Sequence, residues 1–298
     1  MTDTQSVRPC PVCGSKSSRH FASAPGAVIC GKTTPELFPY ELCDGCGSVF
    51  IRQIPSPNDL AAYYEDESYH NHMEPGQLSM ADAIFARLSR PRPSHGNQHL
   101  DFGCGPGQYM EFMRRGGWKT TGIEFSDAAA APARTRFPVV LTSEVGSLPN
   151  QGFDYITLLH SLEHVPDPQQ ILTALARKLA PDGEMLVEVP NVFCHEYRWF
   201  GVSFSMFQAP VHLQFFSDGA MNRLAAGAGL KVVRAGNNPW SPTHYTWSVL
   251  NRVVPRMSRE RKRLVYLVAF PATLPLSLIA DTLGPALPIR QYRLRHAG

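Results

Sequence analysis

The feature that most constrains the fold of this chain is the segment Asp101-Phe-Gly-Cys-Gly-Pro-Gly107, followed seventeen residues later by Glu124. The segment lies between a predicted strand at residues 98–102 and a predicted helix at 108–115, and a second strand at 119–123 precedes Glu124. The three glycines permit positive φ and carry no Cβ atoms that would block a ligand. An acid at the end of the second strand can accept hydrogen bonds from a ribose diol. This order of elements predicts a nucleotide-type cofactor site.

In this segment the chain resembles the class I S-adenosylmethionine-dependent methyltransferases, whose first motif is an acid followed by Gly-x-Gly-x-Gly. Further landmarks follow in the family's order, so that the resemblance covers residues 95–236; they lie at 143–149, 153–168, 171–191, 212–217 and 221–233. The resemblance implies S-adenosylmethionine as cofactor and an α/β fold, a Rossmann-like doubly wound sheet of seven strands. It also implies a set of cofactor-binding residues: Asp101, Gly103, Gly105, Gly107, Glu124 at the ribose, Glu144 and Val145 at the adenine, and His160 near the methionine moiety.

Strand patterns alternate with helical patterns along this region. The expected strands are residues 98–102, 119–123, 138–141, 153–159, 183–189 and 230–235, and the resemblance adds a seventh, antiparallel strand near 287–294. Such alternation predicts a parallel sheet with ligands at the carboxyl ends of its strands. Upstream, residues 57–97 read as a linker and lead-in helices, with apolar residues at helical spacing over 78–90.

Two cysteine knuckles, Cys10-Pro-Val-Cys13-Gly and Cys43-Asp-Gly-Cys46-Gly, are separated by 29 residues. Two such pairs can complete a tetrahedral four-sulfur site, which structural Zn²⁺ prefers. Short strand-like segments between them predict a zinc ribbon over residues 1–56. Redox thiols and unligated packing cysteines are the alternative interpretations. Four cysteines would fill the coordination shell, so the ion is expected to be structural and not catalytic.

The N-terminus has no apolar signal region, and the seven cysteines are an odd number, so we expect reduced thiols and a cytoplasmic protein. Hydrophobic residues make up 43% of the chain and charged residues 18%, as in soluble globular proteins. The net charge of +3 gives no reason to expect nucleic acid as a partner.

The insertion at residues 237–285 contains an uncharged run at 264–280 that Pro271 and Pro275 interrupt. Five cations precede the run: Arg256, Arg259, Arg261, Lys262 and Arg263. One interpretation is a helix pair packed on its own domain or on a second subunit, as in a homodimer. A second is peripheral membrane contact through 256–285, with the cations facing anionic headgroups. A membrane span is the third.

The sequence thus divides into five parts. They are a zinc-ribbon module (1–56), a linker with lead-in helices (57–97), a cofactor-binding core (98–236), a helical apolar insertion (237–285) and the final strand of the core (286–298).

Methyl transfer from a sulfonium is an in-line displacement, so an enzyme mainly aligns the reactants and removes water. A general base is needed only when the acceptor holds its proton tightly. The candidate residues follow the fourth and fifth strands: His160, Glu163, His164, His195, Glu196 and His212. We expect His212 to be the base, with His160 as the second catalytic candidate.

The resemblance predicts an S-adenosylmethionine-dependent methyltransferase with a small-molecule acceptor, such as a sugar nucleotide, a glycolipid intermediate or a specialised metabolite. Oxygen, carbon and nitrogen acceptors remain open. Asn191 is followed by Val-Phe and so lacks the Asn-Pro-Pro-Tyr signature of nucleobase and glutamine methylation. The alternatives are a non-catalytic scaffold that keeps the cofactor fold and an RNA-modifying methyltransferase.

Overall fold

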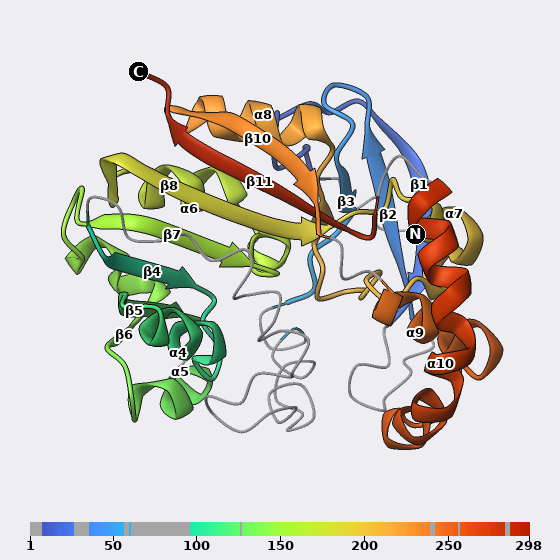
Figure 1. The fold of residues 1–298 in the computed structure, drawn as a ribbon. Helices are drawn as coiled ribbons and strands as arrows, with labels where there is room; N and C mark the ends of the chain where they lie inside the picture. The colour runs from blue at the N-terminus through green and yellow to red at the C-terminus, as the bar shows by residue number, and fades with distance from the viewer. Residues whose placement is uncertain are drawn as a thin grey trace.

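The computed structural model describes residues 8–26, 36–56, 60, 96–125, 127–238, 242–255, 257–283 and 287–298. Within them the chain forms a seven-stranded sheet and a four-stranded sheet (Figure 1). The helix predicted at 78–90 and the strand-like segment at 27–30 lie outside the described residues.

The large sheet confirms the predicted α/β, Rossmann-like fold of the methyltransferase type. In sheet order its strands are β10 (Leu230–Asn237), β11 (Ile289–His296), β8 (Leu179–Pro190), β7 (Phe153–Leu159), β4 (Gln98–Phe102), β5 (Lys119–Glu124) and β6 (Val139–Leu141). The five strands from β8 to β6 pair in parallel, whereas β11 pairs antiparallel with both β8 and β10. The final strand of the chain is therefore the antiparallel one, as predicted.

Helices cover both faces of this sheet. Tyr155 and Ile156 are neighbours in β7, so their side chains point to opposite faces. Tyr155 shares a buried cluster with Phe112 of α4, whereas Ile156 shares one with Leu172 of α6 and Leu224 of α8. The helices of the core are α4 (Gln108–Arg115), α5 (Asp127–Arg134), α6 (Pro168–Ala176), α7 (His195–Phe200) and α8 (Asp218–Gly227), with 3-10 turns η1 (Thr142–Ser147), η2 (Leu162–His164) and η3 (Gly201–Ser203).

Strand β8 begins earlier than the sequence pattern indicates, at Leu179 and not at residue 183. Leu179 pairs with Phe153 of β7, and the pairing register then shifts before Tyr155. The sequence predicts a helix over residues 171–180, but helix α6 (Pro168–Ala176) ends four residues earlier, because the fully buried Leu179 already belongs to the strand.

The four-stranded sheet joins the cysteine segment to the core. Its order is β1 (Ser18–Pro25), β2 (Leu37–Cys43), β3 (Val49–Ile51) and β9 (Gln214–Phe215), all antiparallel. The last strand comes from the core region of the chain, since β9 lies between η3 and α8. The Tyr40 hydroxyl also donates to the carbonyl of His212 at 2.8 Å. The cysteine segment therefore packs directly on the loop that carries His212.

The insertion forms a helical hairpin, α9 (Pro242–Val253) and α10 (Arg259–Leu283). It leaves the sheet after β10 and returns at β11, which are neighbours in that sheet. Figure 1 shows α10 at the periphery, on the side of α7 and the small sheet.

Candidate active site and metal centre

The glycine turn after β4 has the backbone conformation that its sequence predicts. Gly103, Gly105 and Gly107 have φ of 73°, 50° and 81°, a region that residues with a Cβ rarely adopt. A Cβ on Gly103 would lie 2.6 Å from the Cβ of Ser161, whereas one on Gly105 would meet nothing within 4 Å. Gly105 therefore faces open space, as a cradle for a ligand requires.

Glu124, at the end of β5, closes this turn. One carboxylate oxygen accepts the N–H of Gly105 at 2.8 Å, and the other accepts the N–H of Phe125 at 2.7 Å. The residue is 6% exposed. Each carboxylate oxygen retains a further lone pair, so the group can still accept hydrogen bonds from a ribose diol.

Asp101 lies at the end of β4 and is buried. Its carboxylate accepts a hydrogen bond from the Thr157 hydroxyl at 2.6 Å. Burial raises the pKa of Asp101 to about 7; the Thr157 hydrogen bond opposes this shift, and the charge of Glu124 adds to it. A cationic ligand beside Asp101 would therefore favour its ionised form.

The residues predicted to border the adenine lie in η1, directly after β6. Leu141 pairs with Glu124 across β6 and β5, which places η1 beside the proposed ribose site. The Glu144 carboxylate accepts the N–H of Leu141 at 2.8 Å, and Val145 is 8% exposed. Carboxyl ends of β4, β5 and β6 thus bring the predicted cofactor residues to one edge of the sheet.

His160 follows β7 at the same edge and lies between two carboxylates. Its Nε2 is 3.1 Å from Glu188 Oε1, and its Nδ1 is 3.6 Å from Glu163 Oε1. Burial disfavours the imidazolium, but the two carboxylates outweigh it and raise the pKa of His160 to about 10. The side chain is 33% exposed, whereas that of Glu163 is fully buried. His160 is therefore the accessible, cationic member of this network.

His212, the predicted base, lies behind Glu163. It is 3% exposed, and its Nε2 is 3.9 Å from Glu163 Oε1. Its Nδ1 lies 2.8 Å from the carbonyl of Met206, which only accepts, so Nδ1 carries the hydrogen. Burial lowers the pKa of His212 to about 3. This burial argues against direct contact between His212 and an acceptor, because the loop folds inward against β2 and β3.

Glu163, His164 and His212 form a compact buried cluster. One ligand-type atom from each lies within 4.8 Å of the other two. His164 Nδ1 is 2.9 Å from the carbonyl of Val211, and burial lowers the pKa of His164. Neither carboxylate oxygen of Glu163 has a hydrogen-bond partner in the described part of the chain. An anionic carboxylate and a buried neutral imidazole, those of Glu163 and His212, therefore lie directly behind His160.

The other two candidates lie farther along, in α7. The Glu196 carboxylate accepts a 2.5 Å hydrogen bond from Ser248 of α9, and the His195 ring stacks on Trp199 with centroids 5.9 Å apart. Glu196 thus connects α7 directly to the hairpin, whereas His195 contacts Trp199, whose ring in turn contacts Tyr245 of α9.

Two residues of the site were missed by the sequence reasoning. Glu188 in β8 accepts hydrogen bonds from Asn238 at 2.9 Å and from Gln291 at 2.5 Å, in addition to its contact with His160. His244 in α9 is close enough that the charges of His160 and Glu188 affect its pKa, which burial lowers to about 4. The only signal for Glu188 was a charge inside an apolar strand.

The four predicted metal ligands converge in the small sheet. Their Sγ atoms all lie within 4.8 Å of one another, with Cys10–Cys46 at 3.6 Å and Cys13–Cys43 at 3.4 Å. A disulfide would require about 2.05 Å. A tetrahedral site with Zn–S bonds of about 2.3 Å has S–S edges of roughly 3.8 Å, so the four thiols fit zinc.

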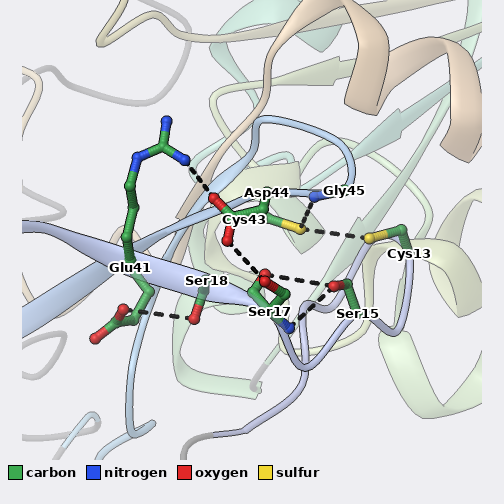
Figure 2. Close-up of polar contacts among 9 residues, drawn as sticks. Cys13, Ser15, Ser17, Ser18, Glu41, Cys43, Asp44 and Gly45 are labelled. Carbon is green, nitrogen blue, oxygen red and sulfur yellow. Dashed lines mark hydrogen bonds and ion pairs between the residues drawn. The ribbon is translucent and has the colours of Figure 1, made fainter.

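The two knuckles have matching backbone hydrogen bonds. Cys10 N–H donates to Ser15 and Gly14 N–H to Cys10, while Cys43 N–H donates to Ser48 and Gly47 N–H to Cys43. Gly14 and Gly47 both have φ of 71°. Around the sulfurs, the Ser48 hydroxyl lies 3.2 Å from Cys10 Sγ, and Gly45 N–H donates to Cys43 Sγ at 3.3 Å. Figure 2 shows the Cys13–Cys43 side of this group.

Comparison with known proteins places the cofactor-binding core of the chain in a family. The crystal structure of a SAM-dependent methyltransferase from Archaeoglobus fulgidus has the same fold, with a TM-score of 0.50 and 16% identity over 78% of this chain and 98% of that one. A family model described as a methyltransferase domain matches residues 69–235. The match covers more than half of the chain, which therefore belongs to this methyltransferase family.

Curated relatives match parts of the chain. The ubiquinone biosynthesis O-methyltransferase of Alkalilimnicola ehrlichii is 35% identical over 105 residues, which are 32% of this chain and 42% of that protein. The C-methyltransferase NovU of Streptomyces niveus is 26% identical over 253 residues, 76% of this chain and 57% of that protein. The chain thus spans about half the length of these two relatives.

Proposed function

We propose that this protein transfers a methyl group from S-adenosylmethionine to a small-molecule acceptor. The observation that carries the proposal is the sheet edge where the glycine turn, Glu124 and the His160 network meet. Glu124 would hold the ribose, η1 would border the adenine, and Asp101 would face the positive charge of the cofactor. When bound, the cofactor supplies an electrophilic methyl group on a sulfonium.

Charge at this edge suits a cationic cofactor. Asp101 and Glu124 lie at the ends of β4 and β5, and Glu163 and Glu188 flank the single imidazolium of His160. The carboxylates outnumber the cation, so the local field favours the sulfonium and ammonium groups of S-adenosylmethionine.

We assign His160 to the reaction itself and His212 to the packing of the loop behind Glu163. His160 is partly exposed and can orient the nucleophilic group of the acceptor through its imidazolium. An attacking hydroxyl becomes strongly acidic as its bond to the methyl group forms. Its proton would pass to water or to a carboxylate beside His160, because the imidazolium of His160 already carries both of its protons. His212 is buried and holds its loop in place, because its Nδ1–H donates to the carbonyl of Met206 and its own carbonyl accepts the Tyr40 hydroxyl.

Oxygen and carbon are the acceptor atoms that the relatives favour, since one is named as an O-methyltransferase and the other as a C-methyltransferase. Sugar nucleotides, glycolipid intermediates and specialised metabolites are the proposed substrate classes, and a structural zinc ion in the cysteine site is the second proposed cofactor. We also propose a cytoplasmic location.

Incubation of a metabolite extract with the protein and methyl-labelled S-adenosylmethionine tests the function. Mass spectrometry should detect a labelled small molecule with the wild-type protein and none with Gly105→Val, whose side chain would occupy the open cradle. Absence of any labelled product across extracts, with cofactor binding intact, would favour a non-catalytic scaffold.

A further inference from the structure

Helix α10 presents an apolar face to solvent. Its exposed large side chains range from 40% for Val265 to 80% for Val268. At 100° per residue, one stripe runs from Leu264 to Ile279 on the outward side of the helix. We call this stripe the outer face of α10: Leu264, Leu267, Val268, Pro271, Pro275, Leu278 and Ile279.

The opposite face of α10 packs on α9. Thr246 and Thr273 share a hydrogen bond of 2.6 Å, and Lys262 donates to Asn251 at 3.1 Å. The rings of Trp247 and Tyr266 stack at 5.0 Å. No contact given for the described residues covers the outer face: the stretch Arg261–Ile279 is long and apolar enough to cross a membrane, yet only 11% of its most apolar window is buried.

Topology argues against a span. The hairpin leaves β10 and returns to β11, which are adjacent strands, so both of its ends are tied to one side of the large sheet. A span would also bury the polar contacts of α9 and the cations at the tip in the hydrocarbon region, at a cost of several kcal/mol for each unsatisfied group. A helix that lies along a surface keeps these groups in water.

Cations stand at the tip of the hairpin, at the start of the outer face. Arg252, Arg261 and Arg263 are exposed there. Over residues 256–263 the sequence has five Lys/Arg and one Glu, a net charge of +4. Beside the hairpin, Trp199 of α7 is 57% exposed and contacts Tyr245 of α9 with ring centroids 6.3 Å apart. Tryptophan is enriched at membrane–water interfaces.

We propose that the outer face of α10 docks on an anionic lipid bilayer, with the arginines of the tip against the headgroups. The apolar stripe would enter the boundary between headgroups and acyl chains, as amphipathic surface helices do. A second copy of the chain could cover an apolar stripe, but its own tip carries the same cluster of cations, whereas an anionic bilayer offers an apolar layer and negative headgroups together. Charge complementarity therefore favours lipid.

The base of the hairpin lies at the proposed active site. Asn238, just before α9, donates to Glu188 at 2.9 Å, and the charges of His160 and Glu188 affect the pKa of His244 near the start of α9. If the proposed methyl transfer is correct, docking would bring this site next to the bilayer, and the acceptor would be an amphiphile drawn from the membrane.

Flotation with vesicles tests the docking without any need for methyl transfer. Wild-type protein should float with vesicles of phosphatidylcholine and phosphatidylglycerol at low salt. It should stay in solution with phosphatidylcholine alone, and high salt should release it. Leu264→Glu with Val268→Glu should abolish flotation, whereas Leu37→Glu, at an exposed site in β2, should not.

The charge contribution is tested separately. Arg261→Gln with Arg263→Gln should weaken vesicle binding by roughly 30-fold, the equivalent of about 1 kcal/mol per cation. The exposed pair Arg223→Gln and Arg234→Gln is the matched control and should leave binding unchanged. Circular dichroism and S-adenosylmethionine binding show that each variant is folded.

Two results would overturn the proposal. One is a wild-type protein that stays wholly in solution with anionic vesicles at low salt. The other is a stable dimer by light scattering that the Leu264→Glu, Val268→Glu variant dissociates, which would identify the outer face as a subunit interface. Either result leaves the methyltransferase proposal intact, because that proposal depends on cofactor binding and product formation.

Discussion

Residues at the carboxyl edge of the sheet differ in how well the sequence around them predicts their place in the site. Glu124 and the glycines belong to one local motif, so their convergence could be predicted. Glu188 could not, because the partners that fix it, Asn238 and Gln291, lie 50 and 103 residues away. His212 could be found as a candidate, but only the packing of its loop on β2 and β3 shows that it is buried.

Asp101 should make cofactor affinity depend on pH. Its pKa is raised to about 7, so the carboxyl gains its charge as pH rises through neutrality. A cationic cofactor binds the ionised form better, and affinity for S-adenosylmethionine should increase about tenfold from pH 6 to pH 8. Calorimetry at several pH values measures this. Asp101→Asn should show only the pH dependence of the cofactor itself; an identical profile for both proteins would remove Asp101 from the site.

His160→Gln should slow catalysis roughly 100-fold while it changes cofactor affinity by only a few-fold. The substitution removes the cation between Glu163 and Glu188 and leaves an uncompensated buried charge. It should also destabilise the protein by about 2 kcal/mol, less than a fully buried pair because the ring is partly exposed.

The pH dependence of folding distinguishes this ion pairing from simple packing. Because the folded-state pKa of His160 is raised to about 10, its stabilisation is fully present below the unfolded pKa near 6.5 and is lost as pH rises through 10. Urea unfolding from pH 6 to pH 10 should therefore show a stability difference between wild type and His160→Gln that shrinks with pH. A constant difference would assign His160 a packing role only.

At the scale of elements, periodic segments were predictable and short ones were not. The seven strands of the large sheet lie where apolar runs or the family resemblance indicated, although β8 begins four residues early. Strand β9 has two residues and no periodicity, and it is a strand only because β3 offers it a pairing edge. Through β9 the cysteine knuckles support the loop of His212. No local sequence pattern predicts this contact, because its two sides are far apart in the chain.

One zinc ion per chain should be bound by Cys10, Cys13, Cys43 and Cys46, and its removal should loosen β9. The variant Cys43→Ser with Cys46→Ser should lose the zinc, with a folding cost on the order of 10 kcal/mol for this segment. Cys194→Ser, at a buried position outside the site, is the matched control. Elemental analysis measures the metal, and hydrogen exchange at residues 212–217 measures the loop.

Full zinc content in the double variant would show that the ligands are misassigned. A second metal equivalent that survives loss of the cysteines would point instead to Glu163, His164 and His212.

At the scale of the whole molecule, the order of motifs was sufficient to predict the fold class. The place of the insertion was also predictable, between the sixth strand and the last. Which face of α10 is covered depends on the packing of α9 against it, through Thr246, Trp247 and Asn251. The sequence alone favoured a packed helix pair and left a surface helix and a membrane span as alternatives for the same apolar run.

The central claim is that S-adenosylmethionine binds on the glycine turn with its ribose on Glu124. Isothermal titration of S-adenosylmethionine and its demethylated product into wild type, Glu124→Ala and Gly105→Val tests it most directly. We expect wild type to bind both ligands. Glu124→Ala should lose about 1.5–3 kcal/mol of binding free energy with the charge-assisted contacts, and Gly105→Val should lose more. Unchanged affinity in both variants, or no binding by wild type, would contradict the account.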